Sequence, residues 1–193
     1  MLIVCIVGMP GSGKSVVVKA AKDIGIPVYN MGDVVREETL KRYGKITPEF
    51  MRLTSINLRK EHGSTIIAEQ TIERIKKDGL DKCIIVVDGV RSLDEINVFK
   101  KYGDVVIIAI HASPKTRFER LLKRKRPGDP DNWEEFYKRD KVELEFGIGS
   151  VIALADHMIV NEGPIEEAYK RAREILERMI ENVCKGRNRG KTN

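Results

Sequence analysis

The residues best suited to chemistry lie near the N-terminus, where an apolar run is followed by Gly8-Met-Pro-Gly-Ser-Gly-Lys-Ser15. This spacing matches G-x-x-x-x-G-K-[ST], the phosphate-binding loop (P-loop), between a predicted strand and a predicted helix. The glycines let backbone N–H groups turn inward around phosphate oxygens, and the positive end of the helix points at the same oxygens. Lys14 supplies a cation for the β- and γ-phosphates, and Ser15 supplies a hydroxyl for Mg²⁺. The sequence therefore predicts a nucleoside triphosphate site formed by the whole loop: Gly8, Met9, Pro10, Gly11, Ser12, Gly13, Lys14 and Ser15.

A carboxylate follows a second strongly apolar run, Cys83-Ile-Ile-Val-Val-Asp88. P-loop enzymes keep at the end of such a strand the carboxylate that orders Mg²⁺ through its water shell. We therefore predict that Asp88 and Ser15 are the metal residues. The alternative for Asp88 is a strand-end residue that caps a turn.

The elements that must position these groups alternate along the chain. Short apolar runs cover residues 2–7, 27–29, 83–88, 104–110 and 157–160. Their continuity is typical of strands buried on both faces, and hence of a parallel sheet. Helix-start signals separate them at Thr47-Pro48, Ser92-Leu-Asp-Glu95, Ser113-Pro114 and Gly163-Pro164. The alternation predicts a three-layer α/β/α fold with a five-stranded parallel sheet, the P-loop NTPase fold.

Composition narrows the class of protein. The chain has 193 residues, 41% hydrophobic and 33% charged, which fits one soluble domain. No apolar run approaches the ~20 residues of a membrane span, and Met1–Val7 lacks the flanks of a signal peptide. We expect a cytoplasmic protein. Its three cysteines, Cys5, Cys83 and Cys184, are scattered, which favours free thiols over a disulfide framework.

The net charge is +6, and basic residues are concentrated in two places. Residues 185–193 carry four basic residues and no acid, and we predict a disordered, solvated tail. Contact of this tail with RNA or an acidic partner is the lesser alternative. The second basic stretch runs from Lys115 to Arg126 with Glu119 as its one acid.

Several further segments carry a resemblance to known kinases. Gly32-Asp-Val-Val-Arg36 resembles the G-D-x-x-R segment of adenylate kinase-type nucleoside monophosphate kinases, and Asp88-Gly-Val-Arg91 is similar to their D-G-x-x-R segment, one residue shorter. Arg117–Arg124 resembles the start of their mobile lid, and Arg139-Asp140 resembles its end. Asn161-Glu-Gly-Pro164 resembles the N-x-G-[SP] loop that lies against adenine in this group and in dephospho-CoA kinases. Overall the chain most resembles a small archaeal family of nucleotide kinase-like proteins related to both.

The resemblance implies a role for each segment. Arg36 and Arg91 would bind the acceptor, and Arg120, Arg124 and Arg139 would close over the transferring phosphoryl. Asn161, Gly163 and Pro164 would lie against the base of ATP. Arginine suits such work because its planar fork grips phosphate oxygens in two places.

The sequence leaves two hypotheses for the role of Asp33. Dephospho-CoA kinases place an aspartate just after their second strand, which implies that Asp33 is a base for a hydroxyl acceptor. Otherwise Asp33 is the N-cap of the helix that contains Arg36.

The lid segment has one further feature. On a helix from Trp133 to Ile148, the residues Trp133, Phe136, Tyr137, Leu144 and Ile148 share a stripe, with Asp140 in its middle. A carboxylate in an apolar stripe should be paired, so we predict that Asp140 binds a lid arginine.

Together these features predict one kinase domain over residues 1–184, with an acceptor-binding helical insert at about 32–80 and a short lid at about 120–140. The chain lacks the N-K-x-D segment of Ras-type GTPases. The favoured function is transfer of a phosphoryl group from ATP, with Mg²⁺, to a nucleotide-like acceptor. The alternatives are a dephospho-CoA kinase-like transfer to a hydroxyl and a nucleotide-gated ATPase that binds a protein or RNA.

Overall fold

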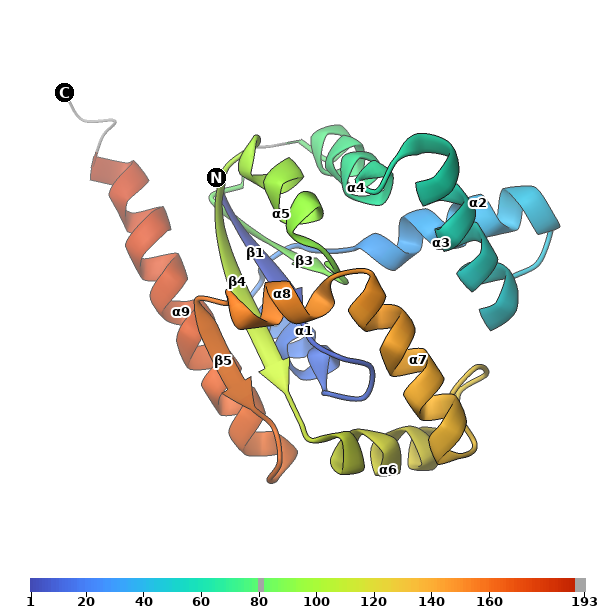
Figure 1. Ribbon diagram of the computed structural model, residues 1–193. Coiled ribbons are helices and arrows are strands. Elements are labelled where there is room, and N and C mark those ends of the chain that lie inside the picture. Colours follow the sequence, from blue (N-terminus) through green and yellow to red (C-terminus); the bar gives the residue numbers. More distant parts are fainter. Residues whose placement is uncertain (80–81, 190–193) are drawn as a thin grey trace.

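A five-stranded parallel sheet forms the centre of the computed structural model, which describes residues 1–79 and 82–189. The strand order is β2-β3-β1-β4-β5 (Figure 1). The strands are β1 (Leu2–Val7), β2 (Val28–Asn30), β3 (Ile84–Asp88), β4 (Asp104–His111) and β5 (His157–Val160). Since β1 is central and buried throughout, the P-loop that follows it lies in the middle of the carboxyl edge of the sheet.

The helices follow the predicted starts. The N-cap side chains of Thr47, Ser92 and Ser113 each accept a hydrogen bond from the backbone N–H three residues on. The helices are α1 (Lys14–Asp23), α2 (Met31–Tyr43), α3 (Pro48–His62), α4 (Ile66–Lys77), α5 (Leu93–Lys100), α6 (Pro114–Arg124), α7 (Trp133–Glu145), α8 (Ile148–Ala153) and α9 (Ile165–Arg189).

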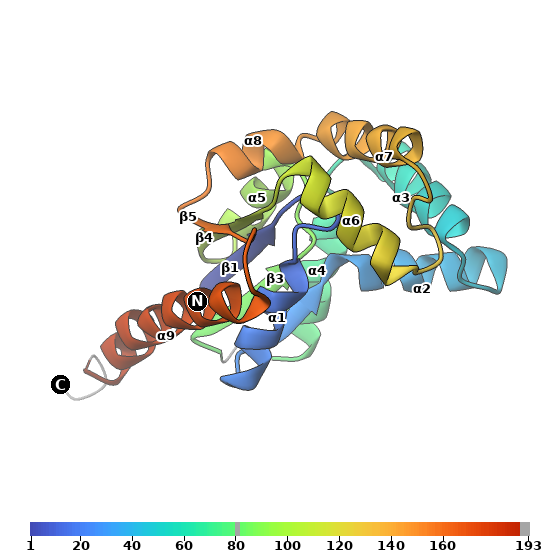
Figure 2. The same cartoon turned by 90° about the horizontal axis from the view of Figure 1, so that it is seen from below.

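Two hydrophobic clusters sandwich the sheet. Successive residues of β1 alternate between them: Ile3, Cys5 and Val7 face one cluster, and Leu2, Val4 and Ile6 face the other. Helices α1 and α9 cover the second face, and α4, α5 and α8 contribute to the first (Figure 2). The predicted three-layer α/β/α fold is therefore confirmed.

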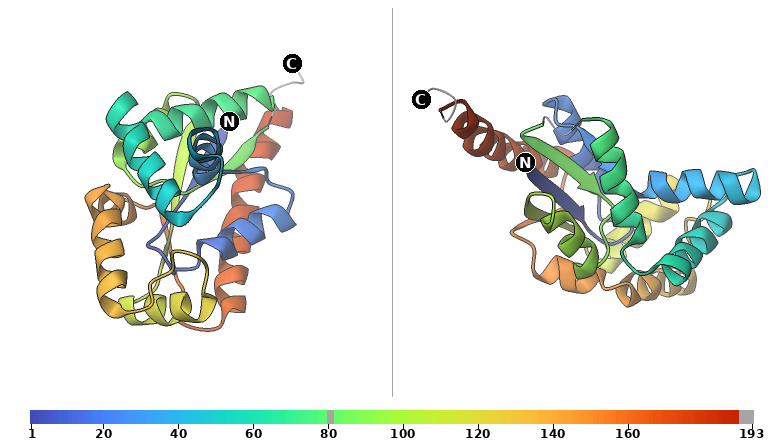
Figure 3. Two further views of the ribbon diagram at one scale, coloured as in Figure 1. Left: turned by 90° about the vertical axis from the view of Figure 1, so that its right-hand side faces the viewer. Right: turned by 90° about the horizontal axis from the view of Figure 1, so that it is seen from above.

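Two helical projections leave the sheet near its carboxyl edge. Helices α2 and α3 form one, between β2 and β3 in the chain, and α6 and α7 form the other (Figures 1 and 3). The first lies within the segment predicted as the helical insert, whose last helix, α4, packs on the sheet instead. The second, α6 with α7, includes the segment predicted as the lid and is called the lid below. The two projections stand on either side of the strand ends that carry the P-loop.

The lid helix is shorter than predicted. It ends at Glu145 because Gly147 takes a left-handed conformation, with φ 97°, and α8 starts afresh at Ile148. Phe136 and Asp140 are buried, but Trp133, Tyr137 and Leu144 are exposed. The predicted apolar stripe is therefore wrong over much of its length, because α7 buries Phe136 and Asp140 alone and ends before Ile148.

Two predictions about the C-terminal part are also wrong. Cys83 and Cys184 form a disulfide, with Cα atoms 5.6 Å apart, because α9 returns along the sheet to the start of β3. Cys5 is a free buried thiol. Residues 185–189 continue α9 rather than forming a disordered tail, since the disulfide anchors the helix one residue earlier. Residues 190–193 lie outside the described ranges.

Within residues 1–79 and 82–189, no helix combines the length and the apolar character needed to cross a membrane.

Candidate active site

The P-loop is held in shape by a side chain from the far end of the chain. Asn161 Nδ2 donates to the backbone oxygen of Ser12 at 2.8 Å. Gly13 has φ 103°, and a Cβ there would lie 2.2 Å from Asn161 Nδ2. Only glycine fits this position, because a side chain would strain the backbone and displace Asn161. The loop after β5 therefore fixes the loop after β1.

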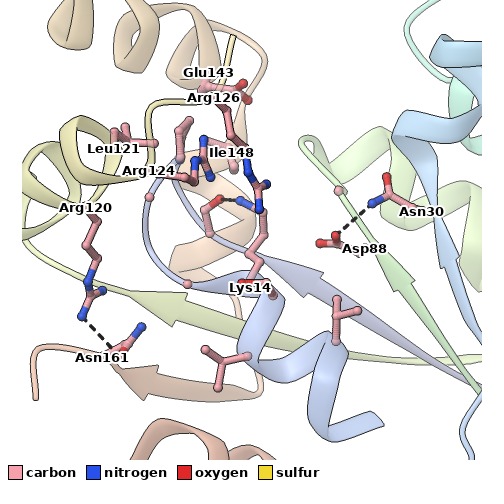
Figure 4. Close-up of a pocket in the computed structure, with 18 of the residues that line it drawn as sticks. Lys14, Asn30, Asp88, Arg120, Leu121, Arg124, Arg126, Glu143, Ile148 and Asn161 are labelled. Atoms are coloured by element: carbon pink, nitrogen blue, oxygen red, sulfur yellow. Dashed lines mark hydrogen bonds between the residues drawn. The ribbon is translucent and has the colours of Figure 1, made fainter. Parts of the chain in front are cut away.

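A cavity of about 570 Å³, here called the P-loop cavity, opens above this loop. Lys14 rises from the start of α1 into its middle, with Asp88 and Asn30 on one side and Arg120 and Asn161 on the other (Figure 4). Its lining carries six cationic side chains and two carboxylates. Such an excess of positive charge suits a polyphosphate.

Lys14 and Asp88, a cation and a carboxylate that face the cavity, are both partly buried. Burial lowers the pKa of the Lys14 ammonium, although the carboxylates of Asp88 and Glu143 act against that shift. Burial raises the pKa of the Asp88 carboxyl, although Lys14 and Arg91 oppose it. Each charge is thus only partly compensated by the chain.

Unsatisfied atoms show what the cavity fits. Among the described residues, three buried side-chain atoms have no hydrogen-bond partner: Ser12 Oγ, Asp88 Oδ1 and Arg120 Nη1. A buried unpaired polar atom is costly. The free Asp88 oxygen and the hydroxyl of Ser15, which lines the same cavity, suit a hydrated Mg²⁺. The free guanidinium nitrogen suits a phosphate oxygen. The residues present therefore fit Mg²⁺ and a nucleoside triphosphate.

A buried ion pair joins the lid to the loop, as predicted for Asp140. Arg117 Nη1 donates to Asp140 Oδ1 at 2.8 Å, and the second guanidinium nitrogen donates to Oδ2. Arg117 also donates to the backbone oxygens of Pro10, at 3.1 Å, and Ala112, at 3.2 Å. This pair ties α6 and α7 to the P-loop, so Arg117 positions the loop.

The three predicted lid arginines all line the P-loop cavity. Arg120 Nη2 donates to Asn161 Oδ1 at 3.5 Å. Arg124 and Arg139 both bind the carboxylate of Asp129 at the lid tip, with Nε–Oδ2 2.8 Å and Nη1–Oδ1 3.3 Å. Burial acts to raise the pKa of Asp129, but hydrogen bonds from Arg124, the Arg126 N–H and Arg139 lower it to about 2.

A second cavity of about 670 Å³, here called the lobe cavity, lies between the α2–α3 projection and the lid. It shares Arg91, Arg139 and Glu143 with the P-loop cavity. Arg91 Nε pairs with Glu143 at 2.8 Å. The two cavities are therefore adjacent, with charged side chains at their border.

Arg91 is held from behind by a fully buried carboxylate, that of Glu95. Glu95 accepts from the Arg91 backbone N–H at 2.7 Å and from Arg59 Nη2 at 2.9 Å. Arg59 belongs to α3. The network therefore couples the α2–α3 projection to the residue at the border of the cavities.

Some predicted residues stay outside both cavities. Asp33 and Arg36 form an exposed pair, 3.7 Å apart, on the outer side of α2. Asp33 is not the helix N-cap, so that reading is wrong. Asn30 caps α2 instead, accepting from the Gly32 N–H at 2.7 Å, because its position directly after β2 precedes the first turn.

Four residues of the predicted ATP set also lie off the lining: Met9, which packs against the core, Ser12, which is buried, and Gly163 and Pro164. Conversely, Glu143, Asn30 and Arg126 line the P-loop cavity without having been predicted. A signal existed for Glu143 alone, since it lies three residues after Asp140 and so near it on one helix. Asn30 donates to Asp88 Oδ2 at 3.2 Å, a contact between separate strands.

Known proteins match the chain over nearly its full length. A family described as "AAA domain" matches residues 7–137. A UPF0200 protein of Staphylothermus marinus is 62% identical over 185 residues, covering 96% of each chain. That of Methanocaldococcus jannaschii is 48% identical over 185 residues, covering 96% of this chain and 94% of the relative.

The chain belongs to the UPF0200 family. Among solved structures it is similar to shikimate kinase from Bacteroides thetaiotaomicron, with 18% identity, a TM-score of 0.58 and coverage of 91% and 98%. Shikimate kinase from Acinetobacter baumannii, in complex with shikimate, has 17% identity, a TM-score of 0.59 and 93% coverage of each chain. These likenesses show a P-loop kinase fold.

Proposed function

We propose that this UPF0200 protein transfers the γ-phosphoryl group of ATP to a nucleotide-like small molecule bound in the lobe cavity. The observation that carries the proposal is the pair of adjacent cavities that share Arg91, Arg139 and Glu143. A hydrolase that only switches between nucleotide states needs no second cavity at the end of its phosphate site. A kinase needs one there, because donor and acceptor must meet in line.

The side chains divide the work by position. Lys14 and the P-loop backbone would hold the β- and γ-phosphates, with Asn161 keeping the loop in shape. Ser15 and Asp88 would hold Mg²⁺, which neutralises developing charge when bound. Arg120, Arg124 and Arg139 would reach the transferring group from the lid, which also excludes water.

The lid must change its contacts for this to happen. Arg124 and Arg139 both bind Asp129, so both guanidinium groups are held at the lid tip. Phosphate oxygens compete well for arginine because they also accept two hydrogen bonds at once. Binding of ATP would therefore draw both arginines from Asp129 toward the cavity.

The test is release of ADP from Mg·ATP with a panel of acceptors: AMP, CMP, UMP, GMP, dAMP and dephospho-CoA. We expect one acceptor to raise turnover far above the rate without acceptor and to gain the mass of a phosphoryl group. Lys14→Ala should abolish that turnover with the fold intact. Retained turnover in Lys14→Ala, or a flat panel over slow hydrolysis, contradicts the proposal.

A further inference from the structure

The two cavities differ in charge, and the difference bears on the accepting group. This inference rests on the proposed function. The P-loop cavity has six cationic side chains against two carboxylates, whereas the lobe cavity has four of each. The first suits a triphosphate. The second is balanced and offers no excess charge to a phosphate dianion.

Three of the four cations of the lobe cavity are also held in ion pairs. Arg91 pairs with Glu143, Arg139 with Asp129, and Lys138 with Glu134. Arg52 has no ion pair within residues 1–79 and 82–189, and it is exposed. A phosphate placed next to the P-loop cavity would have to displace a carboxylate from its arginine and then lie beside it. Like charges at such a distance repel.

Glu143 lies at the border of the two cavities, where the acceptor would meet the γ-phosphate. Of the carboxylates that line either cavity in the described part of the chain, it is the one common to both. Its side chain is 13% exposed and is oriented by Arg91 Nε at 2.8 Å. Its charge acts to raise the pKa of the Lys14 ammonium, which lines the same cavity, against the larger lowering by burial. Asp33, by contrast, is exposed on α2 and lines neither cavity.

A carboxylate at this border can serve as a general base, and only one kind of acceptor needs one. A phosphate acceptor is already ionised, whereas a hydroxyl must lose a proton as it attacks. We propose that the acceptor presents a hydroxyl group at the border of the cavities and that Glu143 is the catalytic residue that takes its proton.

The step balances without a further reactant. The hydroxyl oxygen forms a bond to the γ-phosphorus as the bond to the β–γ bridging oxygen breaks. ADP leaves with the electron pair of that bond, and the hydroxyl proton passes to a Glu143 carboxylate oxygen. Arg91 keeps the carboxylate aimed at the acceptor. The product is a phosphomonoester.

The first arm of the test separates accepting groups by matched pairs: adenosine against AMP, cytidine against CMP, uridine against UMP, guanosine against GMP, with dephospho-CoA added. Products are read by phosphorus NMR, which distinguishes a phosphomonoester from a phosphoanhydride. We expect a phosphomonoester. A phosphoanhydride made from a nucleoside monophosphate leaves the proposed function standing and overturns the hydroxyl proposal.

The second arm changes Glu143 itself. Glu143→Gln keeps an oxygen for Arg91 but cannot take a proton, and Glu143→Asp keeps the carboxylate on a shorter arm. We expect kcat to fall by about 10²-fold or more in Glu143→Gln, less in Glu143→Asp, with unchanged affinity for ATP. Glu145→Gln, an exposed residue on the same helix that lines neither cavity, should match the wild type.

Each result decides the matter. Wild-type kcat in Glu143→Gln overturns the proposal, and so does a loss equal in the Gln and Asp variants, which indicates positioning alone. If the wild type uses water as its one acceptor, Glu143→Gln and Glu143→Asp are compared with it by their rates of ATP hydrolysis. A wild-type hydrolysis rate in Glu143→Gln then overturns the proposal. A wild-type protein that consumes no ATP with any acceptor overturns the proposed function and this inference together.

Discussion

The Arg117–Asp140 pair gives a stability prediction whose size follows from burial. Arg117 is 4% exposed and Asp140 is 9% exposed. Asp140→Asn keeps the shape of the side chain but removes its charge, so the guanidinium stays buried without a counterion. Breaking a buried pair in this way costs about 3–5 kcal/mol. We expect a loss of about 3 kcal/mol in the free energy of unfolding, because Arg117 keeps its bonds to Pro10 and Ala112.

The assay is urea unfolding followed by circular dichroism, with a thermal scan beside it. In a domain of this size, a loss of about 3 kcal/mol lowers Tm by roughly 6–12 °C. The matched control is Arg117→Met with Asp140→Leu, which replaces the pair by apolar groups. Such replacements are often neutral in stability. The double variant should therefore unfold near the wild type but bind ATP more weakly, since Pro10 in the P-loop loses its donor.

Two results would contradict a buried pair that ties the lid to the P-loop. If Asp140→Asn lies within about 0.5 kcal/mol of the wild type, the pair is not held in the interior as described. If the double variant is less stable than Asp140→Asn, the pair contributes net stability rather than position, and the coupling of lid to P-loop through Arg117 has been misread.

Three further predictions test other contacts. Gly13→Ala should weaken ATP binding by about tenfold or more in calorimetry, because backbone strain of about 1–3 kcal/mol adds to the clash with Asn161. The control is Gly25→Ala, at φ 77° with nothing within 4 Å, which should bind ATP like the wild type. Equal losses of affinity in the two variants would contradict the role of Gly13. The arginine partners of Asp129 hold its pKa at about 2, below the unfolded value of 3.8. The stabilisation from this carboxylate is therefore present above pH 3.8 and lost as the pH falls toward 2. The difference in unfolding free energy between wild type and Asp129→Asn should shrink over that window, and a constant difference contradicts the assignment. Cys184→Ser should lower the free energy of unfolding by about 2–4 kcal/mol. A reductant should lower the stability of the wild type by the same amount and leave that of the variant unchanged. A wild type whose stability does not respond to the reductant would disprove the disulfide.

The fold was predictable because its signals are local. An N-cap such as Ser92 and its partner lie three residues apart, and the continuous apolar run of β1 carries its burial in its composition. The P-loop is likewise contiguous, so Lys14 and Ser15 could be placed without knowledge of the tertiary structure. The same holds for Asp88, whose position at the end of β3 follows from the strand itself.

What could not be predicted depends on contacts between distant segments. Cys83 and Cys184 are 101 residues apart and meet only because α9 runs back along the sheet. Glu143 is oriented by its ion pair with Arg91, which belongs to a different part of the chain. The resemblance placed Arg36 at the acceptor, yet the turn of α2 points it outward to Asp33. Spacing along a chain cannot report such orientations.

We propose above that the phosphoryl group crosses from the P-loop cavity to a molecule in the lobe cavity. The most direct measurement follows the label of ATP carrying ³²P at the γ-position, incubated with Mg²⁺ and the acceptor panel and separated by chromatography. We expect label in a new organic phosphate with the wild type and in none with Lys14→Ala. Label recovered only as inorganic phosphate would contradict it.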